Sequence, residues 1–307
     1  MSDFLKRTWA EIDLDAIRHN YKRIREAISP KAKICCCVKA DGYGHGASFV
    51  SRELEKMGAD WFAVSNLEEA IQLRRGGVVR PILILGFTPP QMAEKLHELE
   101  IAQTVFSLQY AKELSEYAVK AGVKLNVHVK LDSGMSRIGF LYQELDRDRA
   151  AIDEIESVCR MPGLHAQGIF THFAVSDEGE DGERFTMKQY GCFKEAIEEL
   201  QHRGIVFEIR HCANSGAVLD YPELHLDMVR PGIILYGLMP STKMRNPLGL
   251  IPAMEFKTVI SMLKTVQPGT RVSYGCEFVA EKPTILATVP VGYADGYPRA
   301  LHDKADM

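Results

Sequence analysis

The sequence predicts an α/β protein, a (β/α)8 barrel of the TIM type followed by a smaller β-rich domain. Eight short apolar segments between residues 34 and 230 alternate with amphipathic helical patterns. One unbroken run of strand and helix repeats favours a closed parallel barrel over an open sheet. The chain contains no GxGxxG and no GxxxxGK sequence, which argues against dinucleotide and P-loop folds. Beyond Asn246 alternating strands surround turns without intervening helices.

The composition is that of an ordinary globular protein. A length of 307 residues suffices for one barrel and a small second domain, and a net charge of -4 does not favour nucleic acid as a partner. No apolar run reaches the roughly 20 residues of a membrane helix, and the first residues lack a signal peptide, so we expect a cytoplasmic protein. The seven cysteines show no C-x-x-C spacing and are interpreted as small buried residues, not as metal ligands.

The elements follow one another in a regular order. Residues 8–13 alternate as a strand, and residues 14–29 carry a helical stripe that ends before Pro30. A capping box, Ser65 with Glu68, is predicted to begin a helix. A long helix is predicted over residues 141–161 because Pro162 ends the pattern. The eight barrel strands are predicted at residues 34–38, 61–64, 81–85, 101–106, 124–132, 164–173, 206–214 and 226–230. The barrel is predicted to occupy residues 1–244 and the β-rich domain residues 245–307, and residues 1–13 could instead join the β-rich domain.

Lys39 is the first candidate functional residue. It follows a run of five apolar residues, and the glycines of the segment Ala40-Asp-Gly-Tyr43-Gly-His-Gly46 come directly after it. The carboxyl ends of barrel strands form one rim where chemistry collects. An amine at the end of a buried strand loses hydration of its charged form and becomes available as a nucleophile or base. The alternative is that Lys39 extends to solvent and the glycines serve only the turn.

The fifth strand places polar residues on one face. Residues 125, 127, 129 and 131 are apolar and should pack against the helices, which turns His128, Lys130 and Asp132 into the barrel. Lys130 and Asp132 then form either a structural ion pair or part of a site. Arg137, in the turn beyond, reaches the same rim.

The last three strands add further rim residues. His172 follows the sixth strand, where a lone histidine is more often a satisfied core residue than a functional one. Asn214 and Ser215 follow the seventh strand, and Gly232 follows the eighth. Barrels commonly bind phosphate with the loops after strands seven and eight, so this position predicts a phosphate site.

Several of these segments resemble alanine racemases. Val38-Lys-Ala-Asp-Gly-Tyr-Gly-His-Gly46 is similar to the motif of that family in which the lysine binds pyridoxal 5'-phosphate (PLP) covalently. His128-Val-Lys-Leu-Asp-Ser-Gly-Met-Ser-Arg137 is similar to a second family signature. The resemblance implies PLP as the cofactor, with its phosphate near Tyr43, Ser215 and Ile233. It extends over essentially the whole chain.

The resemblance also implies roles on the fifth and sixth strands. Lys130 matches a lysine that family members can carry as a carbamate and that steers the arginine matching Arg137. That arginine contacts the cofactor and the substrate carboxylate, and Met135 lies beside it. His172 matches a histidine that lies against the pyridine ring. The family places Asn214 and Gly232 at the cofactor phosphate.

Arg230 carries the mechanistic expectation. The matching Val-Arg-Pro-Gly arginine of the family faces the pyridine nitrogen. A guanidinium does not accept a proton, so the ring nitrogen stays unprotonated and withdraws electrons weakly. A carbanion at Cα is then short-lived and quickly reprotonated, which favours racemisation over transamination. The alternative is a salt bridge between Arg230 and a helix.

Tyr274, in Val272-Ser-Tyr-Gly275, resembles the second base of the family. Racemisation removes a proton from one face and delivers one to the other, which suits two groups, Lys39 and Tyr274. A hydrogen bond to His172 is one way to tune the phenol. In the family this tyrosine comes from the partner subunit, so the resemblance implies a homodimer.

The sequence therefore predicts an alanine racemase, an isomerase acting on a small amino acid and supplying D-alanine for the cell wall. Serine or a broader range of amino acids remains open as substrate. A non-catalytic PLP-binding barrel and a structural barrel binding another phosphate are the alternatives from other classes. Family members continue with more strands, so we expect the β-rich domain to be incomplete at Met307.

Overall fold

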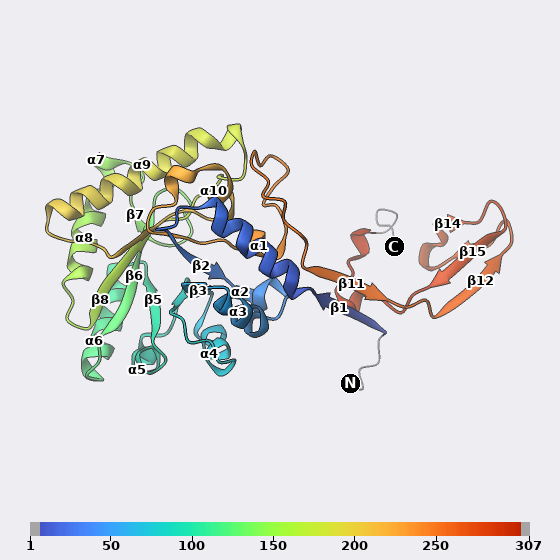
Figure 1. Ribbon diagram of the computed structural model, residues 1–307, viewed down its shortest axis with the longest axis horizontal. Helices are drawn as coiled ribbons and strands as arrows, with labels where there is room; N and C mark the ends of the chain where they lie inside the picture. The colour runs from blue at the N-terminus through green and yellow to red at the C-terminus, as the bar shows by residue number, and fades with distance from the viewer. Residues whose placement is uncertain (1–6, 302–307) are drawn as a thin grey trace. The chain divides into compact units, whose positions relative to one another are not determined.

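A computed structural model describes residues 7–301 of the chain. The chain divides into two compact units, shown in Figure 1. One is formed by residues 13–253. Of the described residues, the other combines 7–12 with 254–301. Residues 237–253 form neither helix nor strand, and the boundary predicted at residue 244 falls in this stretch.

Eight parallel strands form a nearly closed ring in the larger unit. Strand β10 pairs with β2, and each following strand pairs with the next. Between β9 and β10, the Asp227 N–H donates to the carbonyl of Arg210 (3.2 Å) and the Arg230 N–H to that of Ala213 (2.9 Å). The predicted (β/α)8 barrel is confirmed. Its strands are β2 (Lys33–Cys37), β3 (Trp61–Val64), β4 (Ile82–Ile84), β5 (Ile101–Val105), β6 (Leu125–Asp132), β8 (Leu164–Phe170), β9 (Ile209–His211) and β10 (Met228–Val229), and β7 (Phe140–Leu141) pairs with β6.

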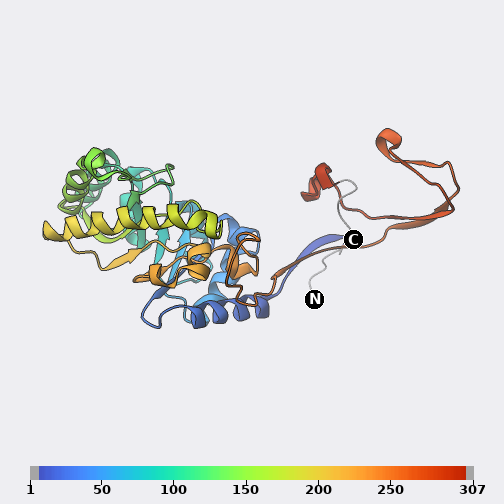
Figure 2. The same cartoon turned by 90° about the horizontal axis from the view of Figure 1, so that it is seen from above.

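Helices lie around the outside of the barrel (Figures 1 and 2). They are α1 (Leu14–Ala27), α3 (Ala47–Lys56), α4 (Leu67–Arg75), α5 (Ala93–Glu98), α6 (Leu108–Lys120), α7 (Leu145–Asp148), α8 (Ala150–Cys159), α9 (Glu180–His202) and α10 (Ser215–Asp220). The segment α2 (Lys39–Tyr43) is a left-handed turn at the end of β2. Short 3-10 segments lie at Pro90–Met92, Pro222–Leu224 and Ile233–Tyr236. Within residues 7–301, no helix combines the length and apolar character that crossing a membrane requires.

The core has two layers because strand side chains alternate in direction. On β6, Val127, Val129 and Leu131 pack in the outer layer, between strands and helices. His128 and Lys130 point the other way, where the ring of His128 lies 5.3 Å from that of Trp61. The facing predicted for this strand is confirmed. The inner layer consists of Cys35, Cys37, Trp61, Ala63, Leu83, Ala102, Ile209 and Met228.

Two predicted helical features are wrong. Residues 141–161 do not form one helix, because the Asp148 carboxylate accepts from the backbone N–H groups of Gln143 and Glu144, both at 3.0 Å. That local bonding makes a turn, with α7 and α8 after it. Helix α4 is capped by Asn66 and not by Ser65. The Oδ1 of Asn66 accepts from the Glu69 N–H at 2.9 Å.

The smaller unit is built of short antiparallel strand pairs. Strand β1 (Thr8–Ile12) pairs with β11 (Met254–Thr258), with Thr8 opposite Thr258. Strand β12 (Met262–Val266) pairs with β15 (Thr284–Thr288), and β13 (Arg271–Val272) with β14 (Phe278–Val279). The predicted β-rich character is confirmed. Its 3-10 segments are Tyr274–Cys276, Tyr293–Asp295 and Arg299–Leu301.

Candidate active site

A cavity of about 200 Å³ lies at the carboxyl ends of the barrel strands. Parallel strands end on one rim, so side chains far apart in sequence meet there. The predicted site residues that line it are Lys39, Tyr43, Lys130, Arg137, His172, Asn214, Ser215, Arg230, Gly232 and Ile233. Met135 is not among its lining residues, and Tyr274 belongs to the other unit.

Lys39 enters the cavity from a left-handed turn. Ala40, Asp41 and Tyr43 have φ of 51°, 52° and 54°, with Gly42 between them at 63°. An L-residue in this conformation costs about 1–2 kcal/mol, so three non-glycine residues in it store strain that their surroundings must offset. The Lys39 side chain is half-buried and lines the cavity, and its Nζ lies 6.0 Å from the Tyr43 ring centroid. The alternative that Lys39 extends into bulk solvent is therefore wrong.

Tyr43, Ser215 and Gly232 form the end of the cavity where phosphate was predicted. A Cβ added to Gly232 would lie 2.8 Å from the Tyr43 hydroxyl oxygen, so only glycine permits this approach. The Gly232 N–H donates to Ser215 Oγ at 2.9 Å, which ties the loop after β10 to the start of α10. Asn214 caps α10, its Oδ1 accepting from the Ala217 N–H at 3.1 Å. Burial raises the pKa of Tyr43, so the phenol remains a hydrogen-bond donor.

Lys130 is a buried amine without a partner. Its side chain is 3% exposed, and its Nζ has no hydrogen bond within the described chain. Nζ lies 4.9 Å from the centroid of the Phe170 ring. The predicted alternative of an ion pair with Asp132 is wrong, because Asp132 Oδ1 instead accepts from the N–H groups of Gly134 (3.1 Å) and Ser136 (2.9 Å). Burial, and then the charge of Arg230, hold the pKa of Lys130 well below its usual value.

Arg230 is buried beneath the cavity and donates to neutral acceptors. Nη1 bonds to Nδ1 of His211 (2.8 Å), and Nη2 to the carbonyls of Thr171 (2.8 Å) and Cys212 (3.1 Å) and, more weakly, to His172 Nδ1 (3.4 Å). Its hydrogen bonds include no carboxylate, so the helix salt bridge considered above is not formed.

The contact with Arg230 fixes a chain of tautomers. A guanidinium only donates, so His211 must accept at Nδ1 and carry its proton on Nε2. That Nε2 lies 2.8 Å from Nδ1 of His128, the next acceptor. Burial, followed by the charge of Arg230, lowers the pKa of His211 and His172 well below the usual value and that of His128 to about 3. All three rings are therefore neutral near pH 7. His172 is half-buried in the wall of the cavity and accepts from Arg230, so it is not a core residue satisfied within its own element.

Sequence reasoning missed Phe170 and His211. The Phe170 ring stacks on His211 with centroids 4.7 Å apart, and Arg230 lies 5.2 Å from its centroid. Phe170 also lines the cavity, and both Lys130 and Arg230 lie over its ring. Strand periodicity could have found His211, because Ile209 and His211 share the inward face of β9.

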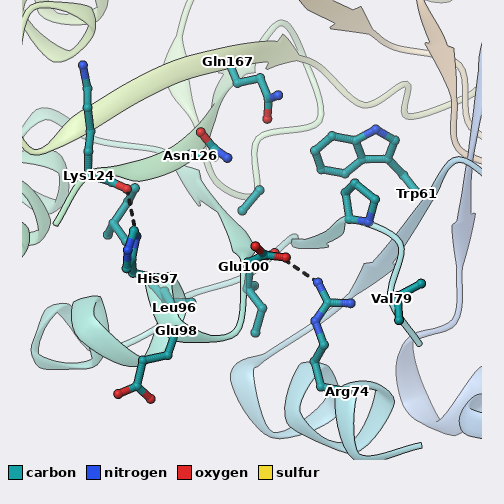
Figure 3. A pocket seen from close by; sticks show the side chains of 14 residues that line it. Trp61, Arg74, Val79, Leu96, His97, Glu98, Glu100, Lys124, Asn126 and Gln167 are labelled. Carbon is teal, nitrogen blue, oxygen red and sulfur yellow. Dashed lines mark hydrogen bonds between the residues drawn. The ribbon is translucent and has the colours of Figure 1, made fainter. Parts of the chain in front are cut away.

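A larger cavity, of about 570 Å³, lies at the opposite end of the strands (Figure 3). Trp61, Lys124, Asn126 and Gln167 line it together with Arg74, and none of them was predicted as a site residue. The Arg74 guanidinium donates to backbone carbonyls, among them those of Leu99 (2.8 Å) and Val78 (2.9 Å). Arg74 therefore holds loops together through their backbone carbonyls.

Tyr274 lies in the smaller unit, 93% exposed. It shares a hollow of about 420 Å³ with Tyr293, Tyr297 and Arg299. The preceding residue, Ser273, has a φ of 61°, in the left-handed region. The phenol is thus presented at the surface of this unit and not packed into it.

Known proteins similar to this chain agree with these observations. The family model "Alanine racemase, N-terminal domain" matches residues 12–240 and "Alanine racemase, C-terminal domain" matches residues 253–307. An alanine racemase of Desulfovibrio desulfuricans is 46% identical over 100% of this chain and 81% of its own length. One of Clostridium tetani is 46% identical over 99% of this chain and 77% of its own.

Solved structures give the same assignment. An alanine racemase of Clostridium difficile 630 matches 95% of this chain and 75% of its own, with a TM-score of 0.89 and 42% identity. The enzyme of Bacillus anthracis with bound L-Ala-P matches 98% and 76%, with a TM-score of 0.89 and 35% identity. A histidine racemase of Leuconostoc mesenteroides matches 95% and 76%, at 0.80 and 31%. The chain belongs to the alanine racemase family.

Proposed function

We propose that this protein interconverts L-alanine and D-alanine with PLP as cofactor and with Lys39 and Tyr274 as the two bases. The observation that carries the proposal is the convergence of Lys39, Tyr43, Ser215 and Arg230 on one cavity of about 200 Å³. These residues come from three different strand ends, because Lys39 and Tyr43 both follow β2. The reaction would take place in the cytoplasm, and the cell would use its product, D-alanine, to build peptidoglycan.

The residues of the cavity fit PLP. Lys39 supplies an amine for the aldehyde, and Tyr43 with the loop of Ser215 and Gly232 supplies donors for the phosphate. Asn214 and Ile233 complete the phosphate end. Arg230 offers N–H groups and no proton acceptor to the ring nitrogen. When bound, PLP withdraws electrons from the substrate Cα, which makes the Cα proton removable.

The two bases would serve opposite faces of the substrate. Lys39 is fixed on the rim of its own barrel, whereas Tyr274 is exposed on the other unit and free to act outside it. We infer that Tyr274 serves the cavity of the partner subunit in a homodimer. His172, neutral and hydrogen-bonded to Arg230, is then placed to accept a hydrogen bond from that phenol.

The remaining predicted residues would orient the substrate. Arg137 is exposed at the mouth of the cavity and can bind a carboxylate in bidentate fashion. Met135, two residues earlier in the same turn, would contact the substrate as well. We infer that Lys130 is carbamylated. In its unprotonated form, which the lowered pKa favours, the amine can attack carbon dioxide, forming an N–C bond and releasing one proton, and the carbamate would give the buried site a negative partner for Arg137.

Proton NMR of L-alanine in heavy water, with PLP-supplemented protein and chiral analysis of the product, tests the proposal. Loss of the α-proton signal together with D-alanine establishes racemisation. Exchange without inversion would mean that the second base does not reach the substrate. No exchange with alanine, serine or histidine would contradict catalysis and favour the PLP-binding protein without activity. Serine and histidine are included because a similar structure is a histidine racemase.

A further inference from the structure

Glu69 lies beside the candidate active site and has no role in the function proposed above. It belongs to the first turn of α4, next to the exposed Glu68. Its Oε1 accepts from the backbone N–H of Ala40 at 2.7 Å. Ala40 directly follows Lys39, so this carboxylate holds the peptide that carries the proposed base.

The Ala40 N–H would otherwise lack a partner. The left-handed turn closes on itself through later groups, with the Gly42 N–H on the Val38 carbonyl (2.8 Å) and the Gly44 N–H on that of Ala40 (3.0 Å). As at the start of any helix, the first N–H has no acceptor within the turn. Glu69 supplies that acceptor from the neighbouring strand–helix unit.

The carboxylate is itself oriented. Oε2 accepts from Ser65 twice, from the N–H at 2.8 Å and from Oγ at 2.9 Å. Ser65 follows β3, and β3 pairs with β2 in parallel, so the two strands end side by side. Glu69 therefore bridges the loops after β2 and β3 with three hydrogen bonds, none of them to a cation.

We propose that Glu69 is a positioning residue, whose carboxylate holds the left-handed turn Ala40–Tyr43 and so directs Lys39 and Tyr43 into the cavity. The strain of that turn makes the contact important, because Ala40, Asp41 and Tyr43 would each relax to negative φ in an unconstrained chain. Relaxation would rotate the bonds on either side of the Lys39 peptide. The proposal rests on the proposed function in that Lys39 is taken to bind PLP.

The test uses Glu69→Gln, which keeps the size of the side chain but replaces one acceptor oxygen and removes the charge. Glu68→Gln is the matched control, one residue away and exposed. Ser65→Ala removes one partner of Oε2 and leaves the Ala40 contact. We expect the PLP dissociation constant to rise about 10-fold or more in Glu69→Gln, by less than about 3-fold in Ser65→Ala, and not at all in Glu68→Gln.

Two further readouts separate positioning from a merely structural role. Hydrogen exchange of the Ala40 amide, measured without PLP, should accelerate in Glu69→Gln and not in Glu68→Gln. Borohydride reduction at saturating PLP, followed by peptide mass spectrometry, should show less pyridoxyl label on Lys39. If Glu69→Gln does not fold, Glu69→Asp, which is too short to span Ser65 and Ala40, is measured in the same way.

The outcomes are distinct. Unchanged PLP affinity or unchanged Ala40 exchange in Glu69→Gln would overturn the positioning role. So would a PLP affinity that returns to the wild-type value when Glu69→Gln is cooled well below its unfolding temperature, because partial unfolding would then explain the loss. Absence of label on Lys39 in the wild-type protein would overturn the proposed function instead. In that case accelerated Ala40 exchange in Glu69→Gln would still support the hold on the turn.

Discussion

The two ends of the barrel present cavities of opposite character. The cavity at the amino ends of the strands is the larger, yet its arginine is satisfied by backbone carbonyls and its Lys124 and Asn126 are exposed (Figure 3). The smaller cavity at the carboxyl ends contains a buried amine that has no hydrogen-bond partner among residues 7–301, and a buried guanidinium among neutral acceptors. Groups held against their preferred solvation mark a functional site better than volume does.

The largest difference between the ends should appear when one lysine is removed from each. Lys39→Ala should lower the racemisation rate by at least about 10³-fold, because it removes a proposed base and the covalent anchor of the cofactor. Lys124→Ala, at the other cavity, should leave the rate unchanged. D-Alanine production in a coupled oxidase assay measures both. Equal losses in the two variants would end the distinction between the cavities.

The two arginines should separate activity from stability. Arg230→Met should lower the rate by about 10²-fold or more, since it removes a fixed charge beside the proposed cofactor ring. Arg74→Met should leave the rate per folded molecule unchanged and lower the free energy of unfolding by about 1.5–3 kcal/mol, because four backbone carbonyls lose a charged donor. Urea unfolding and steady-state kinetics of both variants test this contrast, and a rate loss in Arg74→Met would contradict it.

Lys130→Met should stabilise the barrel while lowering activity. In the unmodified protein, a buried amine without a partner opposes folding, so an apolar side chain of similar length should raise the free energy of unfolding by about 1–3 kcal/mol. If Lys130 is carbamylated, wild-type protein in ¹³C-labelled bicarbonate should show a carbamate signal that the variant lacks. A lower free energy of unfolding in Lys130→Met, together with no carbamate signal in the wild type, would contradict an amine that opposes folding.

A further contrast should appear in the pH dependence caused by His128, which lies inside the barrel. Burial lowers the pKa of His128 to about 3, so the folded protein leaves it neutral while the unfolded chain takes up a proton below about pH 6.5. The unfolded state then binds more protons, and stability falls as the pH decreases from about 6.5 to about 3, by about 1.4 kcal/mol per pH unit for this group. Unfolding of wild type and His128→Asn at pH 7 and pH 5 should show a shallower decline in the variant. Parallel declines would contradict a neutral His128.

The sequence was sufficient for the barrel and for most of the rim. Lys39 and Arg230 directly follow buried parallel strands, and Lys130 belongs to the inward-facing residues of the alternating strand β6, so all three could be placed from the strand pattern. The hydrogen bonds by which side chains cap helices could not be predicted from the strand pattern. Ser65 and Asn66 are both good caps, and the choice between them depends on Glu69 turning back to Ser65.

Local side-chain bonds and tertiary contacts together account for what else was missed. Asp148 bonds two backbone N–H groups and breaks a pattern that looked helical. The left-handed turn contains three non-glycine residues, a conformation that no propensity favours and that neighbouring loops impose. His211 acquires its importance only from Arg230, which is on a different strand. The placement of Tyr274 relative to a cavity remains a prediction from the family resemblance.

The pairing of β1 with β11 has a consequence for how the chain is made. Thr8 and Thr258 face each other across 250 residues of sequence. At a synthesis rate of about 5–20 residues per second, β1 leaves the ribosome at least about 12 s before its partner exists. During that interval the barrel between them can complete its own local strand pairing, whereas β1 waits as an unpaired edge. The smaller unit can therefore pair its two most distant strands only after the whole barrel has been synthesised.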